Sequence, residues 1–140
     1  GPAQPIPFSH RIHVSIKEID CRFCHSTVET GRNAGLPPGE KCVYCHQHVI
    51  PQHPWIQQLR SLVDNQQTIP WVKVTYLPDH VYFSHEQHIT AGLECAECHG
   101  RIEGMDRVRE DQRLLMGLCV ECHTQQERAV PILDCLNCHQ

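Results

Sequence analysis

The sequence has few of the residues that usually fill a protein core. Aromatic residues make up 6% and hydrophobic residues 40% of its 140 residues, which is little for a globular domain of this length. Its apolar runs are all shorter than the roughly 18 residues that a membrane-spanning helix needs. We therefore expect something other than side chains to fill much of the interior.

A strong charge of one sign is also absent. The formal net charge is −4, and the 12 lysines and arginines are scattered along the chain without a run. A broad basic surface for nucleic acid or anionic lipid is thereby excluded. The sequence shows neither a nucleotide-binding loop nor a catalytic triad, so we expect an electron-transfer protein or a subunit of an oxidoreductase complex rather than an enzyme.

No cysteine stands outside one short motif. All 10 cysteines belong to Cys-x-x-Cys-His units. In c-type haem attachment, the two thiols of this motif form thioethers with the haem, and the adjacent histidine binds the iron. The predicted haem-binding cysteines are Cys21, Cys24, Cys42, Cys45, Cys95, Cys98, Cys119, Cys122, Cys135 and Cys138. The predicted proximal iron ligands are His25, His46, His99, His123 and His139.

A zinc site is the main alternative for these cysteines. The gaps from Cys24 to Cys42 and from Cys98 to Cys119 match the spacing of four-cysteine zinc sites. That interpretation leaves the fifth cysteine pair unmatched and does not explain the histidine after every pair. A disulfide scaffold would not require those histidines either. The sequence therefore predicts five haem c groups, which would form the core once the chain wraps around them.

The two halves of the sequence repeat one pattern. The string Phe8-Ser9-His10-x-x-His13 recurs as Phe83-Ser84-His85-x-x-His88, and two motifs follow each copy. We interpret this as the duplication of one ligand-bearing unit. The expected organisation is a single pentahaem domain over residues 1–140, with repeat halves at 1–53 and 80–140 and a linker at 54–79.

Little regular structure is expected outside the motifs. In the linker, Pro54 suits the first residue of a helix that runs to about Asp64, with one apolar face formed by Trp55, Leu59, Leu62 and Val63. Alternation over residues 71–76 predicts a short strand, and a charged helix is expected over residues 106–116. The predicted fold class is a mostly irregular multihaem cytochrome c fold with short α-helices and two pseudo-repeated halves.

Iron atoms with both axial positions closed need a second set of ligands. Two histidines three residues apart lie on one side of a turn, where each can reach a different haem. The four distal ligands predicted in this way are His10, His13, His85 and His88. The candidates for the fifth are His48, His53, His80, Met105 and Met116. We favour Met116, which would give that haem a higher potential than a haem with two histidines.

Four stretches, at residues 4–13, 19–25, 34–38 and 77–85, resemble the pentahaem cytochrome subunit of alternative complex III. That subunit is similar to class III multihaem cytochromes. The resemblance implies an electron wire between a quinol-oxidising module and a soluble carrier or oxidase. It also implies a periplasmic or extracytoplasmic location, with membrane association through the complex. The family has a methionine just upstream of its fourth motif, similar in position to Met116.

The leading functional prediction is therefore an electron-relay subunit of a respiratory or photosynthetic complex. Its expected partners are an iron–sulfur or quinol-oxidising module and a soluble or membrane cytochrome acceptor. A soluble periplasmic carrier is one alternative. A second is an extracellular filament in which His48 or His53 binds a haem of the next subunit. A third is a reductase of small oxyanions, which the ample supply of distal ligands disfavours.

Overall fold

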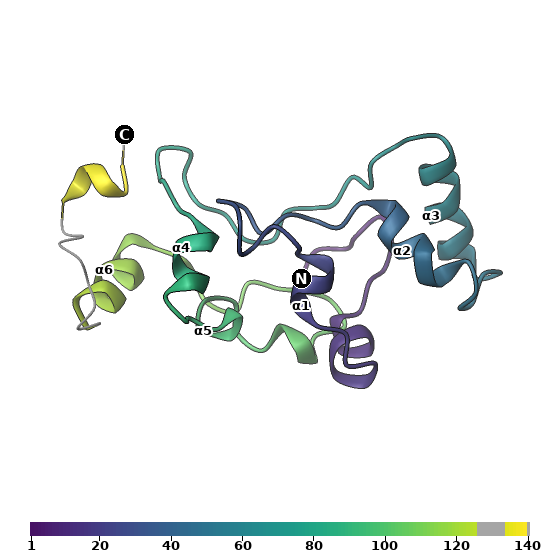
Figure 1. Cartoon of the computed structure of the whole chain (residues 1–140), viewed down its shortest axis with the longest axis horizontal. Helices are drawn as coiled ribbons and strands as arrows, with labels where there is room; N and C mark the ends of the chain where they lie inside the picture. The colour runs from purple at the N-terminus through teal and green to yellow at the C-terminus, as the bar shows by residue number, and fades with distance from the viewer. Residues whose placement is uncertain (126–133, 140) are drawn as a thin grey trace.

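The chain forms an elongated molecule of short helices joined by long irregular segments (Figure 1). The computed structural model describes residues 1–125 and 134–139, so the segment 126–133 of the second repeat half and residue 140 lie outside it. The helical elements are the π-helix η1 (Arg11–Ile16), α1 (Cys21–Cys24), α2 (Gly39–His46), α3 (Pro54–Asp64), α4 (His85–Thr90), α5 (Cys95–His99), η2 (Ile102–Gly104), α6 (Met116–Gln125) and η3 (Cys135–Asn137). The prediction of a mostly irregular chain with short helices is confirmed.

The helix predicted at Pro54 is present as α3. Pro54 is its first residue, and the His53 side chain accepts a hydrogen bond from the backbone N–H of Trp55 at 3.3 Å. These two residues fix the start of the helix, because proline lacks an N–H that would otherwise be unpaired there. The predicted apolar face needs one correction: Ile56 is buried and Trp55 is 44% exposed.

The main hydrophobic cluster lies where α3 meets α2 and the N-terminal segment. Leu59 is 2% exposed, and Ile6, Ile56 and Ile69 pack around it. Gly39, the first residue of α2, lies so close that a Cβ there would stand 2.6 Å from a methyl carbon of Val63. This cluster stabilises the α2–α3 end of the molecule, at the right in Figure 1.

The strand predicted over residues 71–76 was wrong. The Gln4 side chain donates to the backbone carbonyl of Val72 at 2.9 Å and accepts from its N–H at 2.8 Å. A glutamine amide therefore takes the hydrogen bonds that a neighbouring strand would otherwise supply. Within the described residues no strand occurs, and pairing is limited to one isolated bridge between Val81 and His139.

The helix predicted over residues 106–116 was also wrong, since regular structure starts only at Met116. Asp106 accepts hydrogen bonds from Ser9 at 2.6 Å and from Arg11 at 3.0 Å. The Gln112 side chain donates to backbone carbonyls of the third motif. Asp106 and Gln112 are therefore hydrogen-bonded to other segments of the chain, and these bonds hold the residues between them outside a helix. None of the described helices has the length and apolar character needed to cross a membrane.

Replacing Leu59 with alanine is expected to lower the free energy of unfolding by about 2–5 kcal/mol, because it leaves a cavity in the cluster. Thermal or denaturant unfolding of the haem-loaded protein would measure the loss. The matched control is Arg60→Ala on the exposed side of α3, for which we expect a change within about 0.5 kcal/mol. Equal effects of the two substitutions would contradict the placement of Leu59 in the core.

Candidate haem-binding sites

All five Cys-x-x-Cys-His motifs lie on short helical turns, namely α1, α2, α5, α6 and η3. Local capping positions several of these turns. The Asp20 side chain accepts from the N–H of Arg22 at the start of α1, and Asp134 accepts from the N–H of Leu136 at the start of η3. Because residues three apart in a helix share one face, each turn brings its two thiols to the same side.

The structure brings a second histidine opposite four of the motif histidines. Ring centres are 6.1 Å apart for His13 and His46, 6.2 Å for His85 and His99, 5.9 Å for His88 and His123, and 5.4 Å for His80 and His139. An imidazole nitrogen binds a transition metal at about 2 Å and the ring centre lies about 1 Å beyond it. Two imidazoles on opposite sides of one metal therefore have centres about 6 Å apart.

At the first motif, the candidate partner is His10. Burial, together with the nearby His25 and His13, lowers the pKa of His10 to about 4. The imidazole is therefore neutral at pH 7, as a metal ligand must be. Among the described residues, the buried His10 Nδ1 atom has no hydrogen-bond partner. A buried polar atom without a hydrogen bond costs free energy unless another group binds it. His10 therefore suits the position of a metal ligand.

The repeated string Phe-Ser-His-x-x-His adopts the same geometry in both halves. Phe8 lies edge-on to His10 at 4.9 Å and stacks on His13 at 4.3 Å. In the second half, Phe83 lies 4.9 Å from His85 and 4.4 Å from His88 in the same two orientations. One phenylalanine thus orients two imidazoles in each half.

Backbone carbonyls fix the orientation of five of these ten rings. Ring nitrogen Nδ1 lies 2.7–3.0 Å from a carbonyl oxygen in His13, His25, His46, His85 and His88. An Nδ1–H that donates to a carbonyl leaves Nε2 with its lone pair free, and it raises the basicity of the ligand. This is the usual arrangement behind a metal-binding histidine.

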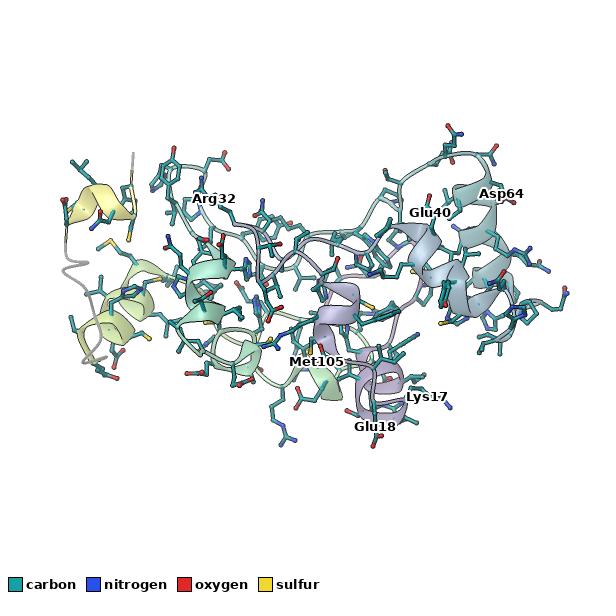
Figure 2. The ribbon with its side chains drawn as sticks, in the orientation of Figure 1. Lys17, Glu18, Arg32, Glu40, Asp64 and Met105 are labelled. Carbon is teal, nitrogen blue, oxygen red and sulfur yellow. The ribbon has the colours of Figure 1, made fainter. Side chains whose placement is uncertain are left out.

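The apolar surface of the polypeptide also suits a large apolar cofactor. Phe23, Tyr44 and Leu136 lie within or beside motifs and are 47%, 72% and 77% exposed. Figure 2 shows many side chains projecting from the ribbon, whereas Met105 near the middle of the molecule is buried. Side chains beside the motifs can therefore pack against porphyrin faces and cover them.

The structure separates the candidates for the fifth distal ligand. Met116 begins α6 and is 68% exposed, and Met105 is buried near η2. His53 caps α3, and His48 is exposed. His80 is the candidate that lies against a motif histidine. The repeat gives no signal for it, because the position equivalent to His80 in the first half is Pro5.

The imidazoles come together in pairs rather than in clusters. In the described part of the chain, no group of three or more histidine, cysteine, aspartate or glutamate side chains converges in a way that could hold a metal ion. The ring pairs have about the separation that two imidazoles on opposite sides of one metal would have.

Replacing Gly35 with alanine is expected to disturb the first motif. Gly35 has a φ of 74°, and a Cβ there would lie 2.6 Å from the Thr27 hydroxyl oxygen. Its carbonyl oxygen is 2.7 Å from Nδ1 of His25. We expect a loss of about 1–2 kcal/mol in unfolding free energy from the left-handed backbone alone, together with a shifted potential of one haem in a redox titration. Gly104→Ala, where a Cβ meets nothing within 4 Å, should leave that potential unchanged.

Comparison with known proteins finds similarity to multihaem cytochromes. Residues 81–140 match the family model described as "Cytochrome c7 and related cytochrome c". The chain is also 38% identical over 97 residues to the protein named "Menaquinone reductase, multiheme cytochrome c subunit" of Nitratidesulfovibrio vulgaris. That match covers 69% of this chain and 45% of the relative, so the chain spans less than half the length of this relative.

Proposed function

We propose that this chain is a multihaem c-type cytochrome of the electron-transfer kind that binds five haem c groups, each iron held between two histidines. Its matches to a cytochrome c7 family model and to a multihaem cytochrome c subunit support this class. The observation that carries the proposal is the placement of a second histidine beside four of the five motif histidines, and the buried His10, which lacks a hydrogen-bond partner at Nδ1, is the candidate for the first motif. We assign His80 in place of Met116 as the fifth distal ligand. The proposed distal set is His10, His13, His80, His85 and His88.

Such sites suit electron transfer rather than catalysis at the metal. Haem, when bound, supplies one-electron redox chemistry. The histidines would close both axial positions, so no substrate could reach the iron. Phe8 and Phe83 keep the distal rings in place, and backbone carbonyls hold the Nδ1 protons. Rigid ligands require little rearrangement when the charge of a site changes, which suits a relay.

We further propose that the chain relays electrons between a membrane quinone-reactive module and a redox protein on the periplasmic or extracytoplasmic side. The relative is named as a cytochrome subunit of a menaquinone reductase, and the resemblance to the alternative complex III subunit points to quinone chemistry as well. The partners would be an iron–sulfur or quinone-reactive subunit and a cytochrome acceptor. Co-purification of the native chain with a membrane quinone oxidoreductase would support this role.

Haem counting tests the proposal most directly. The intact mass together with a pyridine haemochrome spectrum should give five haems per chain. Low-temperature EPR of the oxidised protein should show low-spin haem throughout. Fewer than five haems, or a strong high-spin signal from the wild-type protein, would overturn the proposal of five sites with two histidines each.

A further inference from the structure

We propose that the haem sites, numbered by the order of their motifs, lie in one row in the spatial order second, first, third, fourth, fifth. Electrons would then enter and leave the chain through the second and fifth sites. This inference rests on the proposed function and adds the path to it. The alternative is the order of the motifs along the sequence, in which the first site would be an end.

The second and first sites are neighbours. His10 and His13 lie on one turn at the start of η1, and the His13 ring faces His46 of the second motif. Lys41, beside the second motif, donates to the Phe23 carbonyl oxygen within the first motif at 2.6 Å. The Lys41 ammonium also lies 4.9 Å from the centre of the Phe23 ring.

The two halves meet through their equivalent first sites. Backbone N–H groups of His85 and Glu86 donate to the carbonyls of Arg32 and Gly31, in the loop after the first motif.

A second set of contacts crosses the same junction in the opposite direction. The N–H of Arg11 donates to the carbonyl of Met105, and the Arg11 side chain binds Asp106, both in the segment after the third motif. Each half therefore packs its distal-ligand helix against the segment that follows the first motif of the other half. The first and third sites lie together at this junction.

The third and fourth sites are linked as the first and second are. His85 and His88 share α4 and face His99 and His123. The first four sites thus form two equivalent pairs that meet through the first and third sites.

The fifth site extends the row beyond the fourth. Val81 and His139 of the fifth motif form the isolated bridge, shortly before α4, which carries His88 of the fourth site. The N–H of Tyr82 donates to the carbonyl of Cys138 at 2.8 Å. Figure 1 shows α2 toward one end of the longest axis, then α1 and α5, and at the other end α6 with the C-terminal turn beside it.

Anomalous diffraction at the iron edge from crystals of the full, haem-loaded chain would test the order. The iron of the second site should have the first-site iron as its nearest neighbour, and the first-site iron should also neighbour that of the third. A second-site iron that lies closer to the third than to the first would overturn the proposal. A count below five would instead defeat the proposed function, so the two failures are distinguishable.

Site removal in solution gives an independent test through exciton coupling of the Soret bands in circular dichroism. Cys21→Ala with Cys24→Ala removes an interior member of the proposed row, and Cys42→Ala with Cys45→Ala removes an end. If pair couplings add, the first variant should lose about twice as much coupling as the second. The opposite ranking would favour the sequence order and contradict the proposal. Should either variant fail to fold, the iron positions still decide.

Discussion

Replacing His80 with alanine is expected to convert one low-spin haem of the oxidised protein into a high-spin haem. His80 is the ring that lies 5.4 Å from His139, and its loss would open one axial position of the fifth haem. EPR and the visible spectrum would report about one haem in five as high-spin, since spin state follows axial ligation. The haem count should stay at five, because both cysteines of the fifth motif are unchanged.

Met116→Leu is the matched control for this substitution. Met116 is well exposed at the start of α6, and leucine has a similar volume but no sulfur. We expect its spectra to equal those of the wild-type protein. A high-spin signal in Met116→Leu, with none in His80→Ala, would restore methionine as the fifth distal ligand.

Production of the same chain without haem attachment, in the cytoplasm, is expected to yield a polypeptide without a cooperative unfolding transition. The buried hydrophobic residues among those described are few, namely Ile6, Val28, Ile56, Leu59, Ile69 and Met105. Chains of this size that fold around metal or cofactor sites depend on them for stability. The apolar side chains beside the motifs would then face water.

Differential scanning calorimetry and binding of a hydrophobic dye would measure this effect. The haem-loaded chain serves as the control and should melt in a sharp transition with little dye bound. A haem-free chain that melts cooperatively at a comparable temperature would contradict the view that haem forms the core. The α3 cluster around Leu59 can retain local structure without producing such a transition.

Much of the proposed ligand pattern follows from the sequence because it is local. The motif residues are adjacent, and the His-x-x-His spacing predicts that each ring reaches a different site; in the second half, His85 lies against His99 and His88 against His123. The helix at Pro54 was predictable for the same reason, since its starting residue and apolar face lie within one short segment.

The elements that could not be predicted depend on distant partners. Apolar and polar residues alternate over 71–76 as in a strand, but the Gln4 side chain forms hydrogen bonds with the backbone N–H and carbonyl of Val72. Asp106 is held by Ser9 and Arg11, from the other half of the chain. His80 has no counterpart in the repeat. No local pattern in the sequence encodes these pairings.

The junction between the halves has a consequence for how such a chain can be built. The distal-ligand helix of each half contacts the segment after the first motif of the other half, and this reciprocity is that of a dimer with two-fold symmetry. A single unit carrying one such surface could pair with its own copy before any linker joined them. The linker at 54–79 then turns a concentration-dependent encounter into an intramolecular one. The appended fifth motif breaks this equivalence and gives the row two chemically different ends.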